Sequence, residues 1–121
     1  MPLALDDALV PAQPGRAARA GALSVEEPEE VFYRRYMGGS ALGAYYLLKG
    51  TSPGVDPLGP ENVLTFALSV LTGAPISGQS RLTAVARSPL TGAVGDSQSG
   101  GFFPAEMKFA GFDAIVIRGR A

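Results

Sequence analysis

The chain has 121 residues, enough to bury one modest core as a single domain or as part of a larger one. Its 10 Lys and Arg against 11 Asp and Glu give a net charge of −1, without a basic stripe, which argues against a nucleic-acid partner. With 0 Cys and 0 His, the chain offers no thiol nucleophile, no cysteine ligand for zinc or an iron–sulfur cluster, and no histidine base.

The sequence shows neither a membrane-spanning segment nor a secretory signal. No apolar run reaches the about 18 residues that a bilayer crossing needs. Asp6 and Asp7 lie near the start, where a secretory signal would have its apolar region. We therefore expect a cytoplasmic protein whose partners include neither membrane nor nucleic acid.

The composition changes near residue 24. Residues 1–24 are rich in Ala, Pro and Arg and lack clear periodicity, so we expect an irregular arm with one poor strand near Ala22–Glu26. A helix is predicted over Pro28–Met37, because proline and acidic residues suit a first turn and a glycine pair follows. A second helix is predicted from Ser40 as N-cap to just before Gly50.

The second half alternates strands and turns. Val63–Val70 is a predicted strand with a larger and a smaller apolar face, and the smaller face suggests close packing against a second layer. A weaker strand is predicted over Leu82–Arg87, a short helix over Pro104–Ala110 and a buried strand over Asp113–Arg118. We expect the last strand to expose an unpaired apolar edge, so that the lone chain would associate.

A candidate binding loop runs from Asp96 to Gly101. Its glycines lack a Cβ and would let the backbone approach a ligand, while Ser97, Gln98 and Ser99 supply polar groups. Arg81, on a neighbouring predicted strand, would add a guanidinium, so the pattern points to a phosphorylated ligand. The plainer interpretations stay open: a Ser-Gly-Gly run is often only a turn or bulge, and Arg81 can be an exposed strand arginine.

Several blocks in order carry a family resemblance, and their order and spacing are far more specific than any one of them. They read VDPLGPENVL at 55–64, LTG at 71–73, SPLTG at 88–92, SGG at 99–101 and KFAGFDAIV at 108–116. From Gly38 to Arg120 the chain resembles the N-terminal domain of the aldehyde:ferredoxin oxidoreductase family, the tungsten enzymes that oxidise aldehydes to carboxylic acids.

The resemblance implies an α+β fold: a β-rich N-terminal domain, roughly the first of two β-rich repeats, with short helices. Residues 25–121 would then be a partial pterin-binding domain. In the family this domain is a base for molybdopterin-type dithiolenes that hold tungsten (or molybdenum), with Mg²⁺ bridging their phosphates. A [4Fe–4S] cluster, whose cysteines are absent here, passes electrons to ferredoxin.

Carried over by position, the resemblance implies that Arg81, Gln98 and Gly100 bind the cofactor and that Gln98 is a possible Mg²⁺ ligand. No catalytic residue is expected in this segment. Gln98 replaces the family's usual asparagine and is one methylene longer, so its loop would have to shift to keep the short distances that Mg²⁺ demands. The family's GGRG segment reads Gly-Gly-Ser-Ala at 38–41, and its opening strand pair is expected to be replaced by the arm.

Family enzymes are several times longer, so we expect a fragment, a truncated gene product or one piece of a split subunit. Its partners would be the remaining domains or a complementary subunit, and ferredoxin for the full enzyme, an oxidoreductase acting on aldehyde or oxo groups. The chain alone is expected to be inactive. Alternatives are a non-catalytic relict or assembly module that keeps the fold, and a purely structural module. A cysteine-containing continuation downstream would favour the enzyme.

Overall fold

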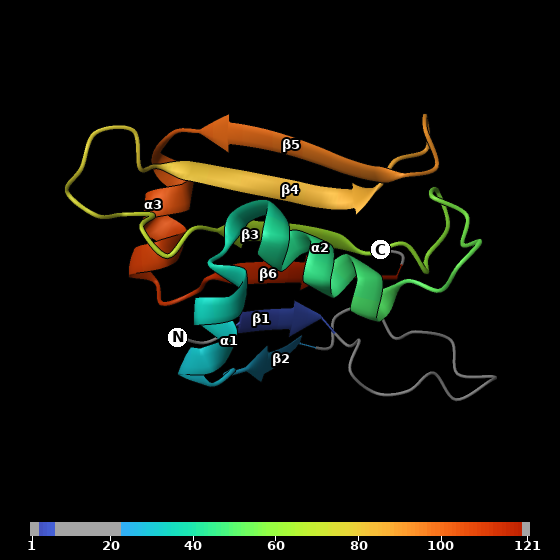
Figure 1. Ribbon diagram of the computed structural model, residues 1–121, viewed down its shortest axis with the longest axis horizontal. Coiled ribbons are helices and arrows are strands. Elements are labelled where there is room, and N and C mark those ends of the chain that lie inside the picture. The colour runs from blue at the N-terminus through green and yellow to red at the C-terminus, as the bar shows by residue number, and fades with distance from the viewer. Residues whose placement is uncertain (1–2, 7–22, 120–121) are drawn as a thin grey trace.

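A computed structural model describes residues 3–6 and 23–119. The elements in chain order are β1 (Leu3–Asp6), β2 (Leu23–Glu26), α1 (Glu30–Tyr36), α2 (Gly39–Gly50), β3 (Leu64–Leu68), β4 (Arg81–Arg87), β5 (Val94–Gly100), α3 (Phe102–Phe109) and β6 (Ala114–Ile117). They build a six-stranded sheet in the order β2-β1-β6-β3-β4-β5, with α2 across one face and α3 at one end (Figure 1). The predicted α+β fold with short helices is confirmed.

The sheet includes the start of the chain. β1 pairs antiparallel with β2 and parallel with β6. β2 confirms the weak strand expected near Ala22–Glu26, but β1 lies in the segment expected to be irregular, and the strand pair expected to be missing is present. A strand this short has almost no local signal and forms because it pairs on both sides. The rest of the expected arm, residues 7–22, lies outside the described residues.

The smaller face of β3 carries the core. Thr65 and Ala67 of β3, and Val63 just before it, are each 0 % exposed. Val63 and Ala67 form one buried cluster with Leu42 and Tyr46 of α2. This confirms the close second layer that the small side chains indicated. Buried side chains of this size let a helix approach the sheet closely and fill the interface at interior density.

The last strand is central, contrary to expectation. β6 lies between β1 and β3, and Ala114 and Val116 are fully buried. The expected apolar edge at Asp113–Arg118 is therefore wrong, because β1, a partner distant in sequence, covers it. The strands at the edges of the described sheet are β2 and β5.

The expected binding loop is a strand over most of its length. β5 runs antiparallel to β4 from Arg87↔Val94 to Arg81↔Gly100. Serine and glycine have weak β propensity, so the sequence pattern hid this strand, whose order comes from the ladder with β4. Only Gly101 lies beyond it, as the residue before α3.

The helix boundaries differ from prediction by a few residues. α1 begins at Glu30 rather than Pro28, and Met37, with φ of 52°, adopts the left-handed C-cap conformation expected of glycine. α2 begins at Gly39, and α3 begins at Phe102, two residues before the predicted Pro104. Within residues 23–119, no helix combines the length and apolarity of a membrane span.

Candidate functional site

The candidate site lies at the end of the sheet where β4 begins, β5 ends and α2 starts (Figure 1). In the ladder Arg81 faces Gly100 and Thr83 faces Gln98. Since alternate strand residues point to the same face, Arg81, Thr83 and Gln98 share one face of the sheet. It is the face that α2 covers, because Thr83 and Val85 lie against α2 glycines. The register therefore brings together Arg81, Gln98 and Gly100, the three residues expected to bind a cofactor.

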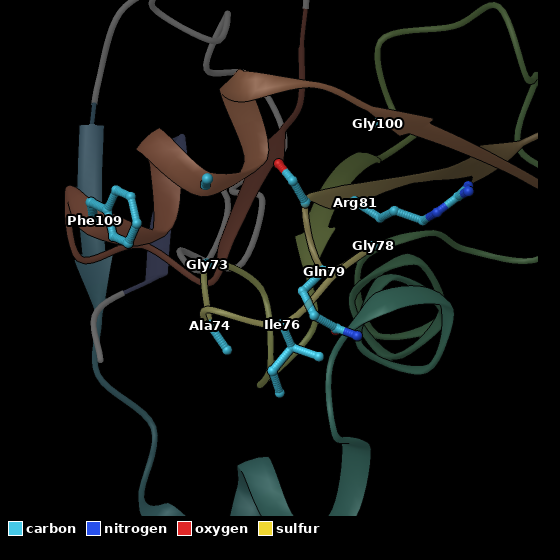
Figure 2. Close-up of a pocket in the computed structure, with 10 residues that line it drawn as sticks. Gly73, Ala74, Ile76, Gly78, Gln79, Arg81, Gly100 and Phe109 are labelled. Atoms are coloured by element: carbon cyan, nitrogen blue, oxygen red, sulfur yellow. The ribbon is translucent and has the colours of Figure 1, made fainter.

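Two adjoining cavities meet at Arg81. The first, about 280 Å³, is lined by the start of α2, the end of β3, Thr83 and Gln98. The second, about 390 Å³, has Gly100 and Arg81 on one side and Ile76 and Phe109 on the other. Figure 2 shows Arg81 reaching away from Phe109 and toward α2. Arg81 thus separates a polar cavity from a more apolar one.

The Arg81 guanidinium is available for a ligand. Its side chain is exposed, and no hydrogen bond or ion pair joins it to another described residue. No Asp or Glu lines either cavity. A guanidinium with its donors free and no carboxylate beside it favours an anionic group such as a phosphate.

The glycines at the end of β5 leave space. A Cβ on Gly100 would lie 3.5 Å from the Ser80 carbonyl oxygen, an ordinary contact, so no neighbouring atom demands glycine there. Gly101 has φ of +125°, a conformation that favours glycine, and its Cβ position is open. The backbone at this end of β5 can therefore be approached closely from outside.

The start of α2 is a part of the site that sequence reasoning noted only as a departure from the family pattern. Gly38 has φ of +90°, and a Cβ on it would lie 2.1 Å from the Leu68 carbonyl oxygen, so only glycine allows this approach to β3. Gly39, with φ of +57°, follows as the first residue of α2. The signal in the sequence was the glycine pair directly before a helix; Thr83 gave none, since it looks like any buried strand residue.

A buried ion pair ties α3 to the turn that borders the smaller cavity. Lys108 Nζ lies 2.5 Å from Asp113 Oδ1 and 3.1 Å from the Ser69 carbonyl oxygen, with only 12 % and 7 % of the two side chains exposed. Lys108 is in the last turn of α3, as expected, but it also ties α3 to the end of β3. Burial, followed by the charge of Asp113, raises the pKa of Tyr33 to about 12. Lys108 therefore links the turn that begins at Ser69 to α3.

The described residues contain no group of three or more His, Cys, Asp or Glu that could hold a metal ion. Amide and carbonyl oxygens are suitable ligands for a hard cation, and the side chains of Gln79 and Gln98 both bring an amide oxygen to the smaller cavity. Together with the free Arg81 guanidinium, the site therefore offers hydrogen-bond donors to an anionic group.

The fold is an α+β domain with two adjoining cavities at one end of its sheet. Residues 18–121 match the family described as "Aldehyde ferredoxin oxidoreductase, N-terminal domain", and the chain belongs to this family. The resemblance seen in the sequence is confirmed.

Individual proteins with similar sequences support the same family assignment. The chain is 46 % identical over 101 residues to the tungsten-containing aldehyde ferredoxin oxidoreductase of Pyrococcus furiosus, covering 84 % of this chain and 17 % of that protein. It is 38 % identical over 103 residues to the WOR-like subunit of an aliphatic sulfonate oxidoreductase from the same organism, covering 80 % and 16 %. It thus spans about a sixth of the length of these relatives.

A solved structure with the same fold is the active-site complex BamBC of benzoyl coenzyme A reductase in complex with 1,5-dienoyl-CoA. It superposes with a TM-score of 0.79 at 35 % identity, over 84 % of this chain and 16 % of that one. The tungsten-containing homologues imply a tungsten-pterin cofactor in the family. Because the match covers a small part of each relative, other domains or subunits are implied.

Proposed function

We propose that this chain is the N-terminal cofactor-base segment of an aldehyde:ferredoxin oxidoreductase-like enzyme, which oxidises aldehydes to carboxylic acids and passes the electrons to ferredoxin. The observation that carries the proposal is the register of β4 and β5, which puts Gly100 beside Arg81 and Gln98 beside Thr83 on one face. Family membership and the tungsten-containing relatives support a tungsten-pterin cofactor as the ligand of this face.

In this proposal Arg81 donates hydrogen bonds to phosphate or pterin oxygens, and Gly100 lets the backbone approach the pterin. The Gln98 amide oxygen is the candidate ligand for a Mg²⁺ that joins the cofactor phosphates. When bound, the pterin-held tungsten (or molybdenum) supplies the redox chemistry, and this segment binds and orients it. With 0 Cys in the chain, ligands for an iron–sulfur cluster would come from other domains or subunits.

Substrate choice would lie elsewhere in the enzyme. The proteins that match the same segment carry an aldehyde, an aliphatic sulfonate and benzoyl coenzyme A in their names. One N-terminal domain shared by such different names fits a role in holding the cofactor rather than in selecting the substrate.

The partner would be the remainder of the enzyme, as further domains or a complementary subunit. Phe102, Phe103 and Phe109 on α3 are 90 %, 58 % and 69 % exposed. Large exposed aromatics clustered on one short helix are typical of an interaction surface. Since the relatives extend far beyond the matched segment, we propose that their additional domains cover α3.

The test is cofactor retention in the complete enzyme. Arg81→Ala combined with Gln98→Ala should reduce bound tungsten and pterin about tenfold or more, because hydrogen bonds to charged groups contribute roughly 1.5–3 kcal/mol each. Metal content and the fluorescence of the oxidised pterin would be measured on purified protein. Arg35→Ala, which removes an exposed arginine on α1, is the matched control and should retain both. Full retention in the double variant would refute the assignment of these residues.

A further inference from the structure

A short turn after β3, residues 69–72, connects α3 to the smaller cavity. Ser69 begins this Ser69 turn, lines the cavity and pairs with Gly38, the N-cap of α2, in an isolated β-bridge. The Ser69 carbonyl oxygen accepts a hydrogen bond from Lys108 Nζ at 3.1 Å, and Asp113 holds the Lys108 ammonium in turn. The Ser69 turn is therefore fixed by α3 and contacts the residue before α2.

Thr72 extends this connection to Arg81. It is only 4 % exposed and lines the same cavity. Thr72 Oγ1 accepts a hydrogen bond from the Ser69 N–H at 3.0 Å, and the Thr72 N–H donates to the Ser69 carbonyl oxygen at 3.1 Å. The Thr72 hydroxyl donates to the Arg81 carbonyl oxygen in a long hydrogen bond of 3.5 Å. A buried hydroxyl with these two partners joins the Ser69 turn to the first residue of β4.

This contact lies where β4 has lost one of its neighbouring strands. The ladder between β3 and β4 ends at the pair Leu68↔Leu82, one residue short of Arg81. Across the sheet, Arg81 still faces Gly100 of β5. Thr72, which follows β3 in the chain, therefore contacts the β4 backbone at the point where pairing with β3 has ended.

The Ser69 turn also packs closely against α3. The residue after it, Gly73, has φ of +84°, and a Cβ on it would lie 3.2 Å from Phe109 Cε1 and 3.5 Å from Lys108 Cγ. A side chain at this position would be both strained and crowded. The last turn of α3 and the Ser69 turn therefore leave each other little room to shift.

We propose that Thr72 is a positioning residue for Arg81. The Arg81 side chain has no hydrogen bond or ion pair to another described residue, so the direction in which it leaves the sheet depends on its backbone. The Thr72 hydroxyl holds that backbone before a ligand arrives, and such preorganisation reduces the ordering that binding requires. The inference rests on the proposed function, in which Arg81 binds the cofactor, and adds a residue that acts through Arg81.

The test compares two substitutions of Thr72 in the complete enzyme. Thr72→Val removes the hydroxyl at nearly constant volume and should lower the tungsten and pterin bound per enzyme about threefold to tenfold, because its hydrogen bonds are lost. Thr72→Ser keeps the hydroxyl and should retain both at the wild-type level. Metal content, fluorescence of the oxidised pterin and the unfolding temperature would be measured on purified protein. Equal losses in the two variants would overturn the role of the hydroxyl.

Combining Thr72→Val with Arg81→Ala separates positioning from a general effect on the fold. If Thr72 acts through Arg81, the valine should cause no further loss of cofactor once the guanidinium is gone. An undiminished loss in the double variant would show that Thr72 acts on the fold instead, and it would overturn the proposal.

The matched control is Thr65→Val, which makes the same chemical change in the core. Thr65 is fully buried on β3, its hydroxyl has no hydrogen-bond partner among the described residues, and it lines neither cavity. This variant should retain the cofactor, and a loss equal to that of Thr72→Val would contradict the proposal.

Hydrogen exchange in the wild type decides the question if Thr72→Val does not fold. The Ser69 N–H should be protected in the cofactor-free enzyme, because its acceptor, Thr72 Oγ1, belongs to a turn that is already formed. Exchange of this amide at the rate of an unprotected one would overturn the proposal.

The outcomes also distinguish this inference from the proposed function. Full cofactor retention in a folded Thr72→Val, together with loss in Arg81→Ala, would overturn the positioning role and leave the cofactor-base role standing. Full retention in the Arg81 and Gln98 double variant would overturn both.

Discussion

The covered centre of the sheet and its β4–β5 end are built in opposite ways. Under α2 the side chains of β3 and β6 are closed to solvent, and Val63, Thr65 and Val116 are each 0 % exposed. On β5, every residue from Asp96 to Gly100 is exposed. The centre gains its stability from burial, whereas the end keeps free donors at the surface. We therefore expect that substitutions can change stability and cofactor binding separately in this domain.

The two regions touch at the ion pair of Lys108 and Asp113. It is buried like the centre, yet it anchors α3 and the Ser69 turn, which border the two cavities. Disturbing the pair should reveal how much the exposed end depends on the packed one.

The largest effect is expected from Asp113→Ala. The change would leave the Lys108 ammonium buried without its carboxylate, which typically costs about 3–5 kcal/mol. We expect the free energy of unfolding from urea titration to fall by that amount. The control is Asp96→Ala, which removes an exposed carboxylate from β5 and should change stability by less than about 0.5 kcal/mol. Similar losses in both variants would contradict the division between centre and end.

A smaller loss is expected from Gly43→Ala, which tests the contact of α2 with β4. A Cβ on Gly43 would lie 2.4 Å from Val85 Cγ2, so α2 would be pushed off the sheet. Overpacking of this kind costs about 1–3 kcal/mol, partly offset by the higher helix propensity of alanine, about 1 kcal/mol.

The partner substitution Val85→Ala makes this test sharper. It removes the methyl groups that the new Cβ would meet, so the double variant should be more stable than the sum of the two single changes predicts. Strict additivity in thermal or urea unfolding would show that α2 does not depend on Gly43 for its approach.

The sequence predicted the covered centre better than the exposed end. Alternating large and small residues from Val63 to Val70 indicated both the strand and its packed face, because burial leaves a period in the sequence. β1 and the central place of β6 left no such trace, since each depends on a partner far away in the chain.

At the site, the residue pattern and the family resemblance both pointed to Arg81, Gln98 and Gly100, and the structure adds the register that joins them. The residues 96–100 look like a loop because serine and glycine are poor strand formers. Thr83 could not be found from sequence, because a threonine that lines a cavity cannot be told from one that only packs in the core. Its role depends on its neighbours in the folded chain, here the first residues of α2, and these become visible only in the structure.

The smallest expected effect is a change with pH on the packed side. Burial and the charge of Asp113 raise the pKa of Tyr33 to about 12, while an unfolded tyrosine titrates near 10.0. Between these values the unfolded chain loses the phenolic proton and the folded one keeps it, so the free energy of unfolding falls as pH rises. Below pH 10 this contribution is fully present.

Tyr33→Phe should therefore make urea stability decline less steeply between pH 10 and 12 than in the wild type. Part of the slope should remain, because burial and Glu26 also raise the pKa of Tyr46, whose hydroxyl lies 3.3 Å from Glu26 Oε2. All other groups are common to the variants, so the difference between the proteins isolates the two phenols. Adding Tyr46→Phe should flatten the profile further, and identical slopes in all three proteins would show that these phenols are not held in their protonated form by the packed side of the domain.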